Sequence, residues 1–445
     1  MSFRLMQGRQ RVRFALALAA VSLVTATPRA ALPPGNVVQQ WNRIAEDTVV
    51  GSGAFQNEGL IYMAYASAAV YDAVTAIEGG YEPLASPIAA HPGASVDAAV
   101  AEAAYTVLRF YFPSQAASLD AFHHEALMPI TDGPAKADGR VVGLAAAQAI
   151  IELRAHDGRL TPIGVTSSFP LRDPGPGVWR LTPPAFAAPQ TPWVGSVQPF
   201  VLNEAGQFHP APPPPLRSQR WVDQFEEVRL YGSAGSTLRT PAQTAIARFW
   251  TANVIRQYNT LGREIATDRS LDVLQTARLL AMINVVGADA QIAVMHWKYT
   301  FLFWRPVTAI DPAAVSADGF GPVPGFEDGN ARTVEETGWR PLIATPNHPE
   351  YPGAHGSLTS AVAEVLTEFL GTDAMDVDVH GFDASGPAGN MNATRHFDST
   401  AQLREEIIDA RLWAGLHYRG SSAAGVDLGA KLAHYDLNHA FGRAR

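Results

Sequence analysis

The chain contains no cysteine among its 445 residues. Disulfide scaffolds, Cys-ligated zinc or iron–sulfur sites and thiol nucleophiles are therefore excluded. Charged residues are scarce, at 17%, and acidic ones outnumber basic ones by 42 to 33. Because broad attraction to nucleic acid needs a positive surface, nucleic acid is not expected as a partner. In suitable context the sequence also lacks an HExxH motif, a P-loop, a GxSxG motif and a dinucleotide fingerprint.

Residues 1–26 have the composition of a secretory signal peptide. Four arginines precede a short apolar run from Phe14 to Val24, and Val24 and Ala26 have the small-residue spacing of a cleavage site. The run is too short for a comfortable transmembrane helix, and an uncleaved anchor or an unstructured tail is the alternative. We expect an exported protein, periplasmic or secreted, with no membrane span in the mature chain.

Most of the remaining sequence predicts helices, and few segments alternate with the period of a strand. We therefore expect an all-α protein built of helical bundles with long proline-rich loops. We divide it into an N-terminal helical half, 27–240, and a C-terminal half, 241–445. A proline-dense stretch at about 157–240 is not expected to hold a long helix, but its aromatic content favours packing over disorder. Helices are predicted at 58–77, 96–111, 141–155, 241–259, 271–304, 357–370, 399–411 and 426–440.

The first of three clusters with chemical potential is HWKYTFLFWRP, from His296 to Pro306. Lys298 and Arg305 are seven residues apart, which on one helix places both side chains on the same face, about 10 Å apart along the axis. The two cations can converge on a tetrahedral oxyanion. A solvated basic pair is the alternative, but the five aromatic residues around them argue against a plain wet surface.

The second cluster is NHPEYPGAHGS, from Asn347 to Ser357, which leads into an amphipathic helix. Free backbone N–H groups at a helix start favour an anion, and the small Gly353 and Ala354 would let it approach the backbone. His355 would then be placed to exchange a proton with the anion. His355 as an ordinary helix-start residue is the alternative, and His348 is interpreted as structural.

The third cluster is ARLWAGLHYRG, which contains Arg411 and His417. Six residues on an ideal helix turn these side chains about 120° apart, so they would flank a ligand or the helix would end before His417. Alone, this spacing is a weak signal.

Together the three clusters have the order Lys-x6-Arg-Pro, Pro-x-x-His at a helix start, and Arg-x5-His. This order resembles the vanadium-dependent haloperoxidases and the related acid phosphatases of the type 2 phosphatidic acid phosphatase superfamily. The resemblance covers about 298–417, and the FLFWRP, YPGAH and AGLHYR segments are most similar to the haloperoxidase branch.

The resemblance implies a role for each matching position. Lys298, Arg305 and Arg411 would bind the oxygens of vanadate, and backbone N–H groups near Gly353 and Ala354 would add donors. His417 would coordinate vanadium, or attack phosphorus in a phosphatase. His355 would be the acid–base group, and Lys298 would also polarise peroxide. These are therefore the candidate residues: His355, His417 and Lys298 for catalysis; Lys298, Arg305, Gly353, Ala354, Arg411 and His417 for the vanadate or phosphate.

The sequence departs from the family pattern in two places. The family often has Ser-Gly before the first histidine, where this chain has Gly353-Ala354. The family's Arg-x5-His motif is often preceded by Ser and followed, four residues after the histidine, by Asp, and here those positions hold Ala410 and Ser421. A carboxylate that orients His417 would then come from elsewhere, with Asp427, Asp289 and Asp409 as candidates.

Three interpretations remain open. The favoured one is a haloperoxidase that uses vanadate and hydrogen peroxide to oxidise halide to hypohalous acid, with a small organic substrate as a further candidate. The second is an exported acid phosphatase with a phosphohistidine intermediate on His417, and the third is a non-catalytic protein that binds phosphate. The sequence leaves open the halide, the role of the N-terminal half and whether the protein is a homo-oligomer.

Overall fold

The computed structural model describes residues 30–160, 175–314, 328–381 and 393–444. Within these ranges the chain is helical, with one small sheet, so the expected all-α class is confirmed. The predicted signal peptide, 1–26, lies outside the described residues. The helices of the N-terminal half run at α1 (Val37–Gly51), α2 (Gln56–Glu78), α3 (Val96–Tyr111), α4 (Ala116–Leu127), α5 (Pro134–Leu153) and α6 (Gln219–Gly232), with short 3-10 turns at Pro113–Gln115 and Pro192–Ser196.

The C-terminal half continues with helices and a two-stranded antiparallel sheet, β1–β2. The sheet was not expected from the sequence, which predicted helices and loops alone. The elements are α7 (Pro241–Phe249), α8 (Val254–Asp268), α9 (Val273–Phe301), α10 (Pro306–Ile310), α11 (Ala354–Leu370), β1 (Ala374–His380), β2 (Thr394–Ser399), α12 (Thr400–Trp413) and α13 (Arg419–His439).

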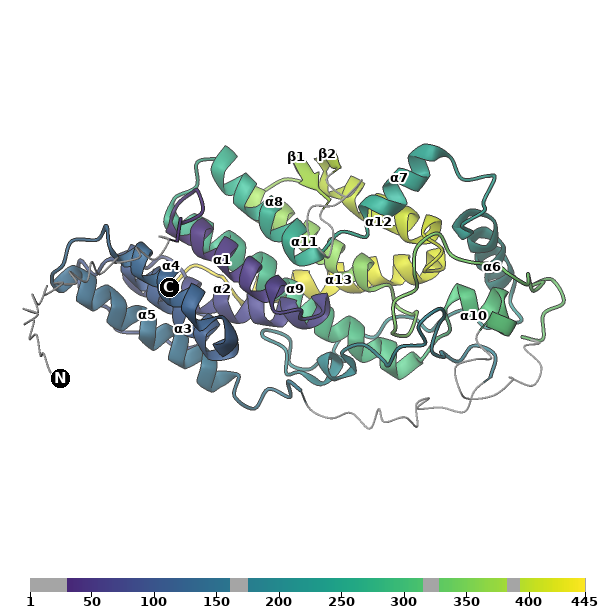
Figure 1. Ribbon diagram of the computed structural model, residues 1–445, viewed down its shortest axis with the longest axis horizontal. Coiled ribbons are helices and arrows are strands. Elements are labelled where there is room, and N and C mark those ends of the chain that lie inside the picture. Colours follow the sequence, from purple (N-terminus) through teal and green to yellow (C-terminus); the bar gives the residue numbers. More distant parts are fainter. Residues whose placement is uncertain (1–29, 161–174, 315–327, 382–392, 445) are drawn as a thin grey trace, which may run out of the picture.

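Helix α9 is the central element of the fold. It starts at a capping box between Asp272 and Gln275 and then runs through an almost continuous series of apolar and small residues. It packs against α2, α8, α11 and α13, and Figure 1 shows it crossing the middle of an elongated molecule with α3, α4 and α5 at one end and α6 and α10 at the other. Both halves therefore contribute to one continuous core.

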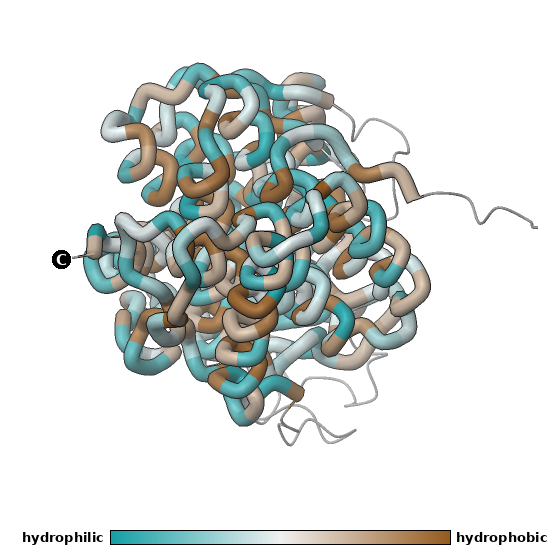
Figure 2. Tube along the Cα trace, turned by 90° about the vertical axis from the view of Figure 1, so that its left-hand side faces the viewer, coloured by the Kyte–Doolittle hydropathy of each residue, from teal (hydrophilic) through white to brown (hydrophobic). Residues whose placement is uncertain are grey.

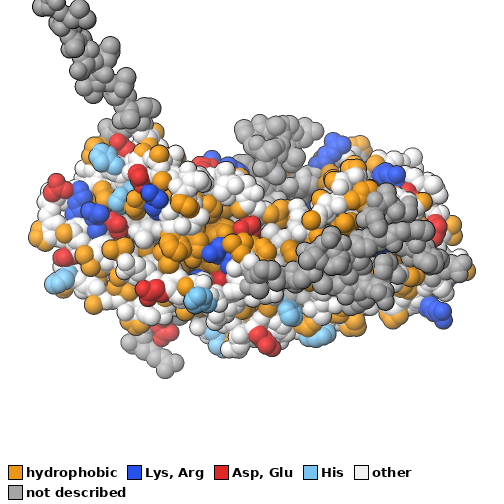
Figure 3. Space-filling view, turned by 60° about the horizontal axis from the view of Figure 1, so that its bottom comes forward, with side chains coloured by type: hydrophobic (Ala, Val, Ile, Leu, Met, Phe, Trp, Pro, Cys, Tyr) orange, Lys and Arg blue, Asp and Glu red, His pale blue; other side chains and the backbone are white. Residues whose placement is uncertain are grey.

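Two helices, α2 and α9, are long and apolar enough to cross a membrane. Their most apolar windows are 83% and 94% buried inside the protein, as in the core helices of soluble proteins. In Figure 2, hydrophobic and hydrophilic residues are interleaved along most of the trace, as expected for helices with one buried and one exposed face. Over the face in Figure 3, acidic and basic side chains are scattered among apolar ones.

The described part of the proline-dense stretch is ordered and packed. Trp179 is fully buried, and the Asp289 carboxylate on α9 accepts hydrogen bonds from the backbone N–H groups of Phe200, Val201 and Leu202 at 2.7, 2.8 and 3.1 Å. The expectation that the stretch holds no long helix is wrong, because the 14-residue α6 begins at the cap residue Ser218, just after the last prolines.

Close packing of α11 on α13 depends on glycines. A Cβ on Gly425 would lie 2.1 Å from the Gly353 carbonyl oxygen, and a Cβ on Gly429 would lie 2.1 Å from the Ser357 carbonyl oxygen. Only glycine permits the backbone of α13 to approach this closely. The start of α11 is thereby held against the first half of α13.

The buried Asp436 is expected to contribute to the pH dependence of stability. Both carboxylate oxygens of Asp436 on α13 are buried without a partner among the described residues, and burial and the nearby Asp289 raise the pKa of Asp436 well above its usual value. Since the folded state holds this proton more tightly, stability is full below the unfolded pKa and falls as the pH rises toward the folded pKa. The slope for one such group is about 1.4 kcal/mol per pH unit.

We expect Asp436→Asn to flatten this pH dependence, because the amide needs no proton to remain neutral. Melting temperatures of the wild type and the variant, measured from pH 4 to pH 8, test this. The gain from the substitution should grow with pH. A gain that is equal at all pH values would show that Asp436 is not the titrating group.

Candidate functional site

The turn between Asn347 and Gly353 organises the site, because its consecutive carbonyl oxygens hold two cations. Arg305 Nε donates to the His348 carbonyl oxygen at 3.0 Å. Lys298 Nζ donates to the carbonyl oxygens of Pro349 and Glu350, both at 2.9 Å. The two side chains converge as expected, and each is fully buried.

The reason given for this convergence was wrong, because Lys298 and Arg305 do not share a helix. α9 ends at Phe301, Leu302 takes a left-handed conformation at φ 51°, and Arg305 is the residue before α10. The backbone from Leu302 to Trp304 instead pairs with the segment around Val178, where Trp179 N–H donates to the Leu302 oxygen at 2.7 Å. Pairing of this kind cannot be read from helical spacing.

The third cluster adds Arg411 and His417 from two sides of a turn. Arg411 lies in the last turn of α12, which ends at Trp413, and His417 follows in the connection to α13. The helix therefore ends before His417, one of the two arrangements left open by the sequence. Arg305 Nη1 lies 3.2 Å from His417 Nε2 and donates to it when that nitrogen is unprotonated.

The carboxylate partner of His417 is Glu350. Its Oε1 lies 2.8 Å from His417 Nδ1 and also accepts from the Tyr418 N–H at 3.1 Å, while Ser421 Oγ donates to Oε2 at 2.6 Å. With Nδ1 bound to the carboxylate, His417 Nε2 is left as the unprotonated nitrogen that faces the arginine.

This finding corrects the three sequence candidates. Asp427 pairs with Lys431 on the surface, Asp409 pairs with Arg419, and Asp289 holds the backbone at 200–202. Glu350 was part of the quoted NHPEYPGAH motif, but 67 residues separate it from His417, and no local pattern indicates the pairing.

His348 was interpreted as structural from the sequence, but in the structure it also contacts the site. Its Nδ1 lies 3.1 Å from Arg305 Nη2, and the residue also lines the cavity described below. It is therefore in contact with the cationic cluster.

The start of α11 supplies fewer backbone donors than expected. Gly353 N–H donates to the Ser421 carbonyl oxygen at 2.8 Å, and a Cβ on Gly353 would come within 3.0 Å of Ser422. Gly353 thus packs on α13 and its N–H is already used. Ala354 is the first residue of the helix, so the N–H groups of the first turn, which have no partner inside the helix, begin there.

Two other expectations concern side chains on α11. His355 lies in the first turn, and its ring lines the cavity without a hydrogen bond among the described residues. Ser357, two residues after His355, is the nearest serine that could replace the family's serine, but it is fully buried and its Oγ lies 3.4 Å from the Ala290 carbonyl oxygen. Ser357 therefore faces α9.

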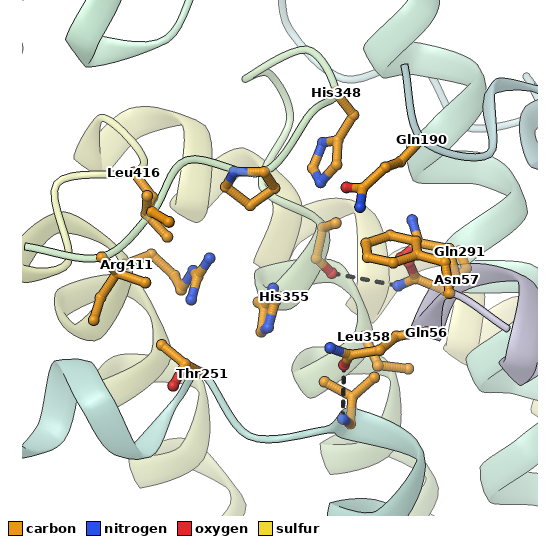
Figure 4. Close-up of a pocket in the computed structure, with 16 residues that line it drawn as sticks. Gln56, Asn57, Gln190, Thr251, Gln291, His348, His355, Leu358, Arg411 and Leu416 are labelled. Atoms are coloured by element: carbon orange, nitrogen blue, oxygen red, sulfur yellow. Dashed lines mark hydrogen bonds between the residues drawn. The ribbon is translucent and has the colours of Figure 1, made fainter. Parts of the chain in front are cut away.

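A cavity of about 250 Å³ leads to this cluster. Figure 4 shows His355 near its centre, with Arg411 on one side and Asn57 and Gln291 on the other. Both halves of the chain line it: Phe55, Gln56, Asn57, Gln190, Thr251, Val254, Gln291, Ile343, Ala344, Pro346, His348, Ala354, His355, Leu358, Arg411 and Leu416. The contribution of the first half was missed by sequence reasoning, since those residues match no motif.

The aromatic residues around Arg305 do not line the cavity. Phe303 and Trp304 pack with Trp221, Tyr351 and Tyr418 in a separate buried cluster. Their function is to exclude water from behind the cations, because a dry surrounding strengthens every electrostatic interaction within the site.

The site buries more positive than negative charge. Lys298, Arg305 and Arg411 are at most 2% exposed, and none forms an ion pair with a carboxylate within the described residues. Burial, together with Arg305, lowers the pKa of Lys298 well below its usual range, and burial lowers that of Arg305 to about 10. Burial and then Arg305 lower the pKa of Arg411 to about 9.

The imidazoles and the carboxyl group respond to the same environment. Burial, followed by the nearby cations, lowers the pKa of His355 and of His417 well below the usual value, so both rings are neutral at pH 7. Burial raises the pKa of Glu350 to about 7. A bound anion would relieve the repulsion among the cations, and this is the chemistry that the arrangement favours.

Comparison with known proteins agrees with this chemistry. The family described as "VCPO second helical-bundle domain" matches residues 278–443, the segment that carries all three clusters. Vanadium chloroperoxidase of Curvularia inaequalis is 26% identical over 274 residues. Over these residues this chain is similar to the vanadium-dependent haloperoxidases. The resemblance seen in the sequence is thereby confirmed.

The extent of the relationship differs between sequence and fold. The alignment with the Curvularia haloperoxidase covers 49% of this chain and 44% of that protein, less than half its length. The fold matches more completely. A bacterial vanadium-dependent iodoperoxidase superposes with a TM-score of 0.74 at 23% identity, over 93% of this chain and 100% of the other. An apo-form bacterial vanadium-dependent chloroperoxidase gives 0.65 at 18%, over 86% and 94%.

The excess of buried positive charge predicts that a tetrahedral oxyanion stabilises the protein. Phosphate at 100 times its dissociation constant would add about 2.7 kcal/mol to the free energy of unfolding. We expect a higher melting temperature with phosphate, and we expect Arg411→Gln to remove most of that gain. Arg419→Gln is the matched control, because Arg419 lies in the same region but pairs with Glu227 and Asp409 on the surface. A gain retained in Arg411→Gln and lost in Arg419→Gln would contradict the assignment.

Proposed function

We propose that this chain is a vanadate-dependent haloperoxidase, which converts hydrogen peroxide, halide and a proton into hypohalous acid and water. The observation that carries the proposal is the cluster of three buried cations, without a paired carboxylate among the described residues, beside the neutral rings of His355 and His417. Arg411 and His355 line the cavity and connect this cluster to it. The relatives with the same fold are haloperoxidases, which supports an oxidative function over a purely binding one.

The residues present fit vanadate. Arg411 Nε is buried and has no partner among the described residues, so one strong donor is available in the site. Three cations complement the charge of a tetrahedral oxyanion, and the guanidinium groups match its geometry. The neutral His417 has an unprotonated Nε2, the form required for coordination.

In this proposal Lys298, Arg305 and Arg411 hold the oxygens of vanadate, the N–H groups that begin at Ala354 add donors, and His417 Nε2 binds vanadium. When bound, vanadate supplies Lewis-acid activation of hydrogen peroxide. Glu350 keeps the His417 ring in place through Nδ1. Lys298, anchored on two carbonyl oxygens, directs positive charge toward peroxide and polarises it.

His355 acts as the acid–base group. Its ring is neutral at pH 7 because burial and Arg411 disfavour the imidazolium form. A neutral imidazole at the cavity wall can take a proton from hydrogen peroxide and later return it to the departing oxygen. No hydrogen bond to the protein has to be broken first, as the ring makes none within the described residues.

A paired assay on the purified chain tests the proposal. One part follows peroxide-dependent bromination and iodination with and without orthovanadate, and the other follows phosphate release from a simple ester. We expect vanadate-dependent halogenation that is abolished in His417→Ala. Ester hydrolysis without halogenation would instead identify an acid phosphatase, which uses the same cationic cluster. Full halogenation by His417→Ala would remove the site assignment.

Glu350 is expected to act through His417. Glu350→Gln would keep an acceptor for Tyr418 N–H but lose the carboxylate at His417 Nδ1, so we expect vanadate affinity or turnover to fall about 10- to 100-fold. Asp409→Asn is the control, since Asp409 was a sequence candidate for the same function and lies at the surface. Equal effects of the two substitutions, measured as the dissociation constant for vanadate, would show that the Glu350 contact is incidental.

A further inference from the structure

The wall of the cavity opposite Arg411 comes from the N-terminal half, to which no function has yet been assigned. Phe55 and Gln56 begin α2, and Asn57 follows in its first turn. Figure 4 places Asn57 and Gln291 across His355 from Arg411. Residues more than 200 positions apart thus face one space.

Asn57 differs from the other amides at this wall. Its side chain is 7% exposed, and Nδ2 is buried with no hydrogen-bond partner among the described residues. Gln56 Oε1 accepts from the Val254 N–H at 2.9 Å, and Gln291 Nε2 donates to the Ala354 carbonyl oxygen at 3.5 Å. Because a buried donor without a partner is costly, the free N–H group of Asn57 indicates a ligand.

The chemistry of the cavity favours a small anion as that ligand. All of its lining residues are neutral or basic, and Arg411 supplies positive charge at the opposite side. Phe55, Val254 and Leu358 add apolar side chains to the lining, next to the amides of Gln56 and Gln291. Apolar side chains around one unpartnered amide donor disfavour a strongly hydrated, multiply charged ion and accept a large monovalent ion that loses its water more easily.

We propose that Asn57 Nδ2 binds the halide substrate, with bromide and iodide as the ions of suitable chemistry. This inference rests on the proposed haloperoxidase function. It gives the N-terminal half a direct part in substrate binding, while the C-terminal half holds the oxyanion. The halide then lies in the same cavity as His355 and Arg411 but is bound by a neutral donor, so it remains free to react.

The first test separates halide binding from the other steps. In Asn57→Leu, which keeps the approximate size but has no donor, we expect the KM for bromide or iodide to rise about tenfold, the equivalent of one hydrogen bond of about 1.4 kcal/mol. The KM for hydrogen peroxide and the dissociation constant for vanadate should remain unchanged. Thr251→Val is the control, because Thr251 also lines the cavity but its hydroxyl donates to the Arg248 carbonyl oxygen. An unchanged halide KM in Asn57→Leu overturns the inference.

The second test does not depend on turnover. Crystals of the wild type and of Asn57→Leu are soaked in sodium bromide, and the anomalous signal of bromine is mapped. We expect a peak beside the Asn57 amide in the wild type alone. If this peak is present but no halogenation occurs, the anion site stands and the proposed function fails. If halogenation occurs while bromide binds elsewhere, the function stands and the Asn57 assignment fails.

Discussion

The site depends on three cations held inside a dry protein. Burying Lys298, Arg305 and Arg411 is costly, and each cation raises the cost of the others. The protein offsets part of this through the carbonyl oxygens of 348–350, which are fixed by the turn and cannot move away. The remainder is left for an anion to neutralise. A bound anion is therefore expected to stabilise this part of the folded protein. The aromatic cluster behind Arg305 strengthens that binding because it keeps water away from the cations.

Glu350 joins the three motifs into one unit. Its backbone oxygen accepts from Lys298, and its side chain reaches His417, Tyr418 N–H and Ser421. In the family pattern the carboxylate lies four residues after the histidine, at the position of Ser421 in the first turn of α13. In this chain the carboxylate is that of Glu350, in the turn before α11, and the Ser421 hydroxyl donates a hydrogen bond to it. In this chain the carboxylate beside His417 is therefore supplied by Glu350 and not by α13.

Sequence reasoning succeeded where one local rule determines the outcome. The apolar periodicity of 357–370 predicted α11, which begins slightly earlier, at Ala354, and His355 lies in its first turn as expected. Sequence reasoning failed where contacts between distant segments determine the local structure. The left-handed Leu302 ends α9 early because the segment around Val178 pairs with the next residues, and the Glu350–His417 pair spans 67 positions. The prediction that Lys298 and Arg305 converge was correct, but the single helix from which it was derived does not exist.

The cationic cluster alone does not determine the reaction, because phosphate and vanadate have the same shape and similar charge. What distinguishes the chemistries is the space in front of the cluster. A phosphatase must admit an ester with its leaving group, whereas a haloperoxidase needs room for peroxide and a small anion. The cavity of about 250 Å³ is lined on one side by Arg411 and His355 and on the other by residues from the start of α2. Residues of the N-terminal half, which has no recognisable motif, therefore form part of the space that a substrate has to enter. For this reason the motifs of the C-terminal half alone do not determine which reaction takes place.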